Sequence, residues 1–232
     1  MSPRRASLAL AATLAFCISA LSPVTERVGA QAKGASSDAS SLEAELLNEI
    51  NLARTKPIEY AGIIEKTRSY FKGNTYQPPG QQALATQEGA KALEEAVAFL
   101  RRAQPLRPFS LSSGMTQGAR TLVLDQGSQG LTGHKGSDGS FCEQRLGRFG
   151  KLQGAVGENL SYSRESARER VIAWLLDDGF ATRGHRQALM HPGYKVVGVS
   201  CGEHARQGVM CVVTFADGFS ETDGQRGGVR SF

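Results

Sequence analysis

Two histidines and two acidic residues, spread over about fifty positions, have side chains that could form one polar site. His134 and His185 each follow a glycine, Glu158 stands within the run Gly-Glu-Asn-Leu, and Asp177 comes three residues after the only tryptophan, Trp174. Imidazole nitrogens and carboxylate oxygens are ligands that Zn²⁺ accepts. The four residue types therefore indicate a site for a divalent metal, provided that the fold brings them together.

The local sequence places these residues in different kinds of structure. His134 lies in a Gly/Ser-rich loop over residues 127–140, and Glu158 lies inside a predicted strand over residues 155–162. His185 stands at the start of a predicted short helix, where the helix dipole favours the neutral imidazole that metals bind. Each side chain also fits a solvent-exposed or turn-forming role, so only tertiary folding can assemble the site.

The second acid has two candidates in the sequence. Ser166 and Glu169 form a predicted capping box that begins a helix, and Gly179 is typical of a helix end. Asp177 borders the apolar stripe of this helix, and Asp178 competes with it for the same role. The helical phase does not decide between the two carboxylates.

The composition is typical of a globular domain without a nucleic-acid partner. The chain has 232 residues, of which 40% are hydrophobic, and a formal net charge of +5. No run of five or more basic residues occurs, which argues against a nucleic-acid-binding protein. No apolar run is long enough to span a bilayer, so we expect no transmembrane segment.

The N-terminal residues have the features of a secretory signal. Arg4 and Arg5 precede an apolar stretch over residues 8–21 that is too short to span a bilayer. We expect a protein that is secreted, to the extracellular space or the periplasm. The predicted organisation is a signal peptide at residues 1–30, a small polar linker at 31–40, a domain at 41–219 and a flexible tail at 220–232.

Three cysteines follow the predicted signal peptide. Residues 194–201 and 209–216 are predicted strands joined by a hairpin-length loop, with Cys201 and Cys211 at similar distances from its centre. A disulfide between these two cysteines is geometrically sensible, and it leaves Cys142 unpaired. No Cys-x-x-Cys pair occurs, so we do not expect a zinc finger.

Helical spacing of apolar residues predicts further helices in the first two thirds of the chain. Ser40 with Glu43 predicts the capping box of the first helix. His191 and His204 have no motif around them, and we expect both at the surface. The predicted helices cover residues 41–54, 83–102, 111–126 and 141–149.

The order of these motifs resembles the CAP superfamily, which includes cysteine-rich secretory proteins, antigen 5 and pathogenesis-related proteins and is also called the SCP domain. The resemblance covers about residues 42–219, and the forms His-Lys-Gly-Ser-Asp-Gly-Ser and Arg-Gly-His-Arg look most like its bacterial branch. The matching features begin with an Asn-x-x-Arg helix at 51–54, a histidine after a Gly/Ser loop at 134 and Gly-Glu-Asn-Leu at 157–160. A tryptophan helix at 174, Gly-His at 184–185 and two closing strands within 194–216 complete them.

The resemblance implies an α+β fold, a three-layer α-β-α sandwich with a central antiparallel sheet and a cavity lined by two histidines and two acids. His134, Glu158 and His185 match the family's residues, whereas Asp177 stands where the family has glutamate. The shorter aspartate side chain reaches less far, which would weaken metal binding or route it through water. The region 56–108 is larger than the usual minimum of the family.

The metal hypothesis gives the four residues distinct roles. His134 and His185 would bind Zn²⁺ or another divalent ion, while Glu158 and Asp177 would orient the imidazoles or a bound water. A structural polar cluster is a competing interpretation of the same four side chains.

Two functions are compatible with such a site. Zinc lowers the pKa of bound water to roughly 7, which permits a metal-dependent extracellular hydrolase. The sequence contains no Ser/His/Asp or Cys/His signature and no His-Glu-x-x-His helix, so nothing requires an enzyme. The resemblance favours a secreted binding module for a lipid, a small molecule or another protein, because CAP-like proteins share a scaffold and differ in their partners.

Overall fold

A four-stranded sheet is the centre of the molecule. The computed structural model describes residues 26–222, with side chains from residue 39 onward. The strands lie in the order β4-β6-β7-β5, and every pairing is antiparallel except the short one between β4 and β6. Their bounds are Ser110–Leu111 for β4, Val196–His204 for β6, Gly208–Glu221 for β7 and Gly150–Tyr162 for β5.

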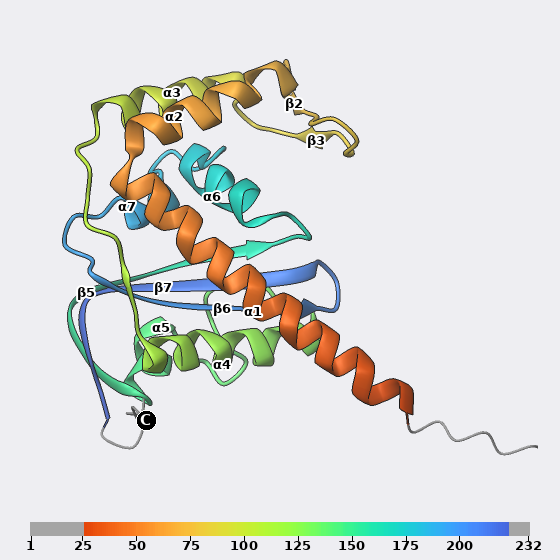
Figure 1. Cartoon of the computed structure of the whole chain (residues 1–232), viewed down its shortest axis with the longest axis vertical. Coiled ribbons are helices and arrows are strands. Elements are labelled where there is room, and N and C mark those ends of the chain that lie inside the picture. The colour runs from red at the N-terminus through yellow and green to blue at the C-terminus, as the bar shows by residue number, and fades with distance from the viewer. Residues whose placement is uncertain (1–25, 223–232) are drawn as a thin grey trace, which may run out of the picture.

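Helices cover both faces of this sheet (Figure 1). One layer holds α4 and α5, and the other holds α1, α6 and α7, with α2 and α3 packed outside it. This arrangement confirms the three-layer α-β-α sandwich expected from the sequence. The bounds are Glu26–Thr55, Pro57–Glu65, Ala90–Arg102, Ser113–Gln129, Cys142–Gly147, Ala167–Leu176 and Gly184–Leu189 for α1 to α7 in order.

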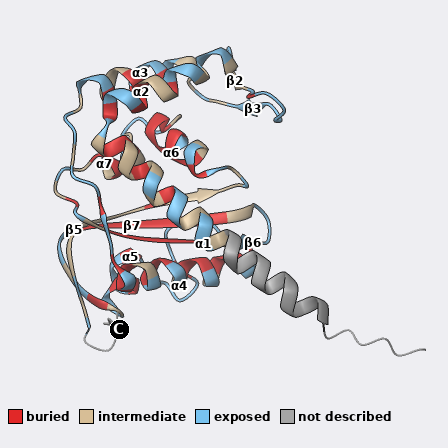
Figure 2. Ribbon diagram, viewed as in Figure 1, coloured by how far each residue is buried: buried red, intermediate tan, exposed pale blue. Residues whose placement is uncertain are grey.

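The two closing strands form the buried middle of the sheet. Residues 210–216 of β7 are all buried, because helices cover both faces and leave no polar side of the strand. Figure 2 shows the buried residues concentrated along β6, β7 and the inward faces of the helices. Cys201 lies directly opposite Cys211 in the β6–β7 pairing and is disulfide-bonded to it, while Cys142 is a buried free thiol.

The N-terminal helix is longer than the sequence predicted. α1 runs through residues 31–40, where the composition predicted a linker, so Ser40 and Glu43 lie inside the helix and not at its start. Once a helix is nucleated, adding a residue to it costs little. The part of the helix after residue 41, which packs through its apolar stripe, can therefore nucleate the turns that precede it. Residues 1–25 of the predicted signal peptide and 223–232 of the predicted tail lie outside the described residues.

The Asn-x-x-Arg pattern, Asn51 and Arg54, anchors the end of α1. The Asn51 amide donates to the Phe109 carbonyl and accepts from the Phe109 N–H. Arg54, which is 1% exposed, donates to four backbone carbonyls and lies 3.7 Å from the centre of the Phe109 ring. These bonds tie α1 to the segment before β4, to the last residue of α7 and to the segment after α7. The carbonyl acceptors are those of Arg107, Leu189, His191 and Tyr194.

Residues 71–86, here called the arm, form a small sheet outside the sandwich. Its strands β1 (Phe71–Lys72), β2 (Thr75–Tyr76) and β3 (Leu84–Ala85) pair antiparallel. The arm extends beside α6 (Figure 1). The helix predicted over residues 83–102 begins only at Ala90, because Gly89 before it has a φ of 60°, outside the helical region.

No helix among residues 26–222 is long and apolar enough to cross a membrane.

Candidate functional site

The first half of the site is a buried carboxylate held between a histidine and an arginine. Glu158 lies on β5, and its side chain is 3% exposed. One of its oxygens is 3.0 Å from Nδ1 of His134, and the other accepts a hydrogen bond from Nη2 of Arg145 at 2.5 Å. Arg145, on α5, also donates to the carbonyls of His134 and Ser140. One guanidinium therefore fixes both the carboxylate and the loop that carries His134.

The second half pairs a histidine with an aspartate at a helix end. Asp177 follows α6 in the left-handed conformation, with a φ of 52°, and is 2% exposed. Its Oδ1 is 2.6 Å from Nδ1 of His185, and its Oδ2 accepts from the backbone N–H groups of His185 and Arg186. Asp177 thus caps α7 and orients the His185 ring with the same carboxylate.

The two halves meet across the edge strand of the sheet. β5 is the outermost strand on its side, with α5 packed against one part of it and α7 against another. His134 with Glu158 and His185 line one cavity of about 380 Å³. Each helical layer of the sandwich therefore contributes one histidine to the same space. Asn159, the neighbour of Glu158, donates to the His185 carbonyl and joins the second half to the strand.

The carboxylate partners determine which ring nitrogen is free. An ionised carboxylate accepts hydrogen bonds and donates none, so Nδ1 of both His134 and His185 must carry the proton. In a neutral imidazole the remaining nitrogen, Nε2, then has a free lone pair. This arrangement, a carboxylate behind each imidazole, is the one that orients histidines for metal binding.

The same contacts remove the two acids from direct metal binding. Both oxygens of Glu158 and both oxygens of Asp177 already accept hydrogen bonds from the protein. Across residues 39–222, no three His, Cys, Asp or Glu side chains gather as a group that could hold a metal ion. The residues present fit two imidazole ligands with Glu158 and Asp177 behind them, and not a set of four protein ligands.

Asp178, the other candidate for the second acid, performs a different task. Its carboxylate accepts the backbone N–H groups of Gln87 and Glu88 at 2.6 and 2.8 Å, just before α3. Arg183 pairs with both Glu88 and Glu95 and lowers the pKa of Glu88 to about 2. These contacts clamp the α3 end of the arm to the loop that carries Asp177.

His191 also lines the cavity, although the sequence predicted it at the surface. The centre of its ring lies 4.2 Å from that of Tyr194 with the planes tilted by 35°, and its Nδ1 is buried without a hydrogen-bond partner among the described residues. Arg145 and His191 are the site residues that the sequence motifs missed. Arg145 offers no sequence signal, because its partner Glu158 lies on another element, whereas His191 stands only six residues after His185.

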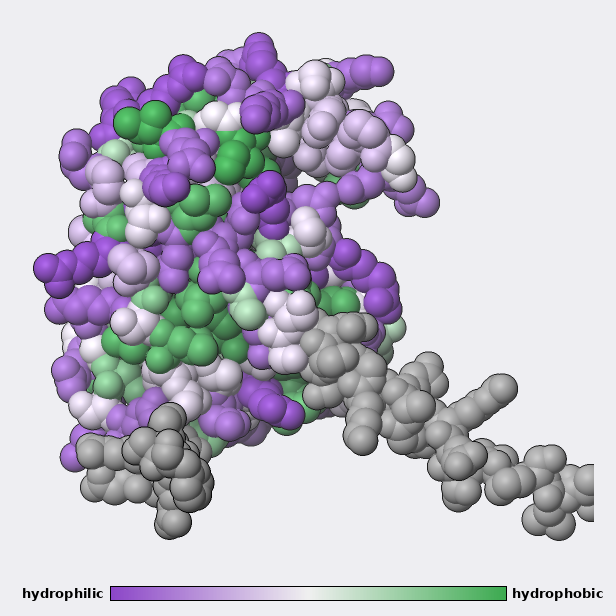
Figure 3. Space-filling model, viewed as in Figure 1, coloured by the Kyte–Doolittle hydropathy of each residue, from purple (hydrophilic) through white to green (hydrophobic). Residues whose placement is uncertain are grey.

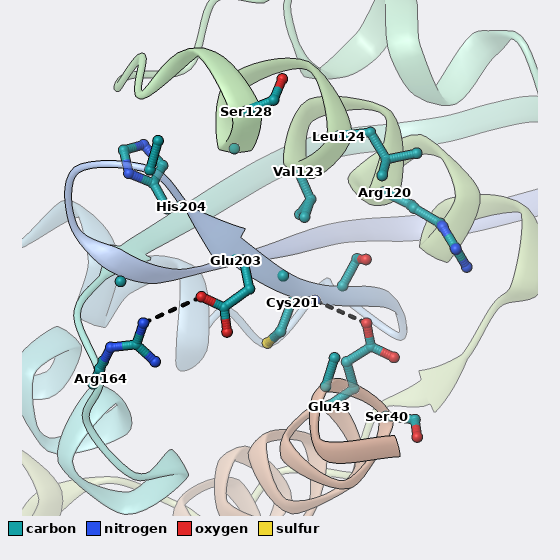
Figure 4. Close-up of a pocket in the computed structure, with 16 residues that line it drawn as sticks. Ser40, Glu43, Arg120, Val123, Leu124, Ser128, Arg164, Cys201, Glu203 and His204 are labelled. Carbon is teal, nitrogen blue, oxygen red and sulfur yellow. Dashed lines mark hydrogen bonds and ion pairs between the residues drawn. The ribbon is translucent and has the colours of Figure 1, made fainter. Parts of the chain in front are cut away.

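A larger cavity, of about 860 Å³, lies between α1, α4 and β6 (Figure 4). Glu43 from α1 accepts a hydrogen bond from the backbone N–H of Cys201, and Arg164 pairs with Glu203 at 3.2 Å. Its acidic side chains are therefore engaged, and they point to different parts of the wall.

His204 in this larger cavity is a structural residue. It is 2% exposed, so the prediction of a surface position was wrong. Nε2 donates to the Leu131 carbonyl at 2.7 Å, and Nδ1 accepts from the N–H groups of Arg206 and Gln207. Both nitrogens are occupied, so the ring closes the β6–β7 hairpin and has no lone pair left for a metal.

Comparisons with known proteins identify the family of the chain. No curated protein sequence matches the chain. Among solved structures, an outer surface protein from Borrelia burgdorferi is 20% identical with a TM-score of 0.42, covering 57% of this chain and 92% of that one. An extracellular protein containing an SCP domain from Bacillus anthracis is 17% identical with a TM-score of 0.39, covering 52% of this chain and 37% of that one. The model of the CAP family, the cysteine-rich secretory protein family, matches residues 94–215, more than half of the chain, and the chain therefore belongs to that family.

Proposed function

We propose that this protein is a secreted binding module in which His134 and His185 hold one divalent metal ion, with Zn²⁺ as the best match. The observation that carries the proposal is the paired geometry: each Nδ1 faces a buried carboxylate, and both rings line one cavity. A structural polar cluster needs no free imidazole nitrogen, whereas this geometry leaves Nε2 unprotonated on each ring.

A metal at this position would supply a Lewis acid with coordination positions open to a ligand. The chain's own residues do the orienting. Glu158 and Asp177 keep the proton on Nδ1 of the two imidazoles. Arg145 fixes the orientation of Glu158. Thr182, Gln187 and Tyr194 add polar side chains to the cavity lining, where a ligand with hydrogen-bonding groups can be recognised.

Export is part of the same proposal. The positively charged and then apolar N-terminal sequence is typical of a secretory signal. The disulfide between Cys201 and Cys211 suits an oxidising compartment, the periplasm or the extracellular space.

Calorimetric titration with Zn²⁺ tests the metal site. We expect one zinc ion to bind the wild-type chain and no binding to the double variant His134→Ala/His185→Ala. Gln187→Ala, which shortens an exposed polar side chain of the same cavity, is the matched control and should keep zinc affinity. Failure of the wild type to bind zinc, or undiminished binding by the double variant, would contradict the proposal. Zinc-dependent turnover of ester or phosphoester substrates by the wild type alone would instead favour the metal-dependent hydrolase.

Asp177→Asn should lower zinc affinity about 10- to 100-fold, because an amide no longer imposes the Nδ1–H tautomer on His185. Asparagine tolerates the left-handed backbone at this position, so the fold should persist. Asp178→Asn, one residue on, changes the same charge away from the imidazole and should leave zinc affinity unaltered. An equal loss of zinc affinity in both variants would show that zinc binding depends on the negative charge alone and not on the tautomer of His185.

A further inference from the structure

A second cavity, of about 330 Å³, lies between the arm and α6. Phe71, Tyr76 and Leu84 of the arm form one wall, and Trp174 and Leu176 of α6 contribute to the other. The surface is hollowed beside the arm in Figure 3. This volume lies at the lower end of the range for ligand pockets, about 300–1,000 Å³, and suits a ligand with one ring or a short chain.

The charged side chains around this apolar space are mostly acidic. Four carboxylates line the cavity, those of Glu165, Glu169, Asp177 and Asp178, against the single guanidinium of Arg170. Within residues 39–222, none of the four forms an ion pair with a lysine or an arginine. The excess of negative charge is local, since the whole chain has a formal net charge of +5.

Arg170 makes no direct ion pair with these carboxylates, although its charge acts on Glu165 and Glu169, so one cation stands against four carboxylates. Arg170 is 1% exposed and donates to the carbonyls of Glu165 and Ser163 and to the hydroxyl of Ser161. Its donors therefore face the backbone of the turn before α6 instead of a carboxylate. Burial first, and then the charges of Glu169, Tyr70 and Glu165 in that order, raise the pKa of the Tyr76 phenol in the opposite wall.

One polar group of the lining has no partner. The Thr86 hydroxyl oxygen is buried and makes no hydrogen bond to any described residue. A buried hydroxyl left without a hydrogen bond costs free energy, so a donor or acceptor supplied by a ligand would be stabilised there. A ligand ammonium group offers donors to such an oxygen and has the charge that the carboxylates lack.

We propose that this cavity binds a small organic ammonium ion, whose apolar body packs between the arm and Trp174 and whose charge lies at Glu165 and Glu169. The acidic lining favours a cation. The aromatic side chains of Phe71, Tyr76 and Trp174 can pack against the apolar part of such a ligand, and their ring faces attract its positive charge. This inference rests on the proposed role as a binding module, but not on the metal. His185 lines both cavities, whereas its partner Asp177 lines only the one beside the arm.

The test uses three probes of equal size and different charge: 4-phenylbutylammonium, 4-phenylbutanol and 4-phenylbutyrate. Trp174 is the only tryptophan of the chain and lines the cavity, so its fluorescence reports occupancy directly. We expect a saturable fluorescence change with the ammonium probe, at least about tenfold weaker binding of the alcohol, and none of the carboxylate. Equal binding of the three probes, or no saturable change with the ammonium probe, would overturn the proposal.

Variants separate the charge from the fold. Glu165 bonds only to the Ser163 hydroxyl through its side chain, so Glu165→Gln should fold normally and bind the ammonium probe several-fold more weakly. Glu203→Gln removes an equal charge at the other cavity and should bind as wild type. Undiminished binding by Glu165→Gln, or the same loss in both variants, would refute the assigned position. The probe series contains no metal, so it tests only the cavity beside the arm. Zinc titration of the same samples tests the metal site, and the failure of either proposal is therefore seen separately.

Discussion

Replacing Arg145 by methionine is expected to lower the free energy of unfolding by about 3–5 kcal/mol, because it leaves a buried charge without its partner. The side chains of Arg145 and Glu158 are 1% and 3% exposed, and their 2.5 Å contact is shielded from water. The variant also deprives the carbonyls of His134 and Ser140 of a donor. Urea denaturation followed by circular dichroism measures the loss. Zinc affinity should fall as well, since Glu158 no longer has a fixed orientation.

Two controls identify the buried charge as the cause. Arg148→Met removes an arginine close by, whose solvent-exposed pair with Asp138 is screened by water and should contribute little to stability. Arg145→Met combined with Glu158→Met replaces both members of the buried pair by apolar side chains and should recover much of the stability. A double variant as unstable as the single one would mean that the lost carbonyl bonds, and not the unpaired carboxylate, dominate.

Replacing Arg54 by methionine should also cost at least about 3 kcal/mol, because four backbone carbonyls lose their donor in the interior. Burial lowers the pKa of Arg54 to about 10, so the guanidinium still carries its proton at neutral pH and donates all these bonds. Methionine preserves the length and the apolar contacts of the stem but offers no donor. The measurement is the shift of the urea midpoint.

The expected consequence of Arg54→Met extends to the site. Arg54 donates to the carbonyls of Leu189, the last residue of α7, and of His191 just after it, and α7 carries His185. We therefore expect amide hydrogen exchange to accelerate in residues 189–194 before it does in β7. Arg101→Met, which breaks an exposed pair with Glu65, should change neither stability nor exchange appreciably. Uniform acceleration across the chain would indicate global destabilisation without a local role.

The motifs of the sequence predicted the main helices and strands of the sandwich, and they singled out the two histidines that the fold places on one cavity. The capping box of Ser166 and Glu169 begins α6 as predicted, because it depends on residues three apart in the chain. The sequence could not choose between Asp177 and Asp178, since that choice depends on where α3 and α7 lie. Only the folded chain turns one carboxylate to His185 and the other to the amides before α3.

Features that depend on contacts between residues far apart in the chain could not be predicted from the sequence. The arm has strands of two residues each, too short to show alternation, and β2 pairs with β3 only across the loop of residues 77–83. Arg145 is buried because a carboxylate and two carbonyls meet it there, whereas an isolated arginine in a short helix is expected in solvent. The same reason applies to His204, whose partners lie in the loop after α4 and in its own hairpin.

Anomalous scattering at the zinc absorption edge, from crystals of the chain soaked in Zn²⁺, measures the metal position directly. We predict one peak at about 2.0–2.1 Å from Nε2 of both His134 and His185, with each Nδ1 still bonded to its carboxylate. A peak bound to the oxygens of Glu158 or Asp177, a peak at one histidine alone, or no peak in the cavity would contradict the paired site.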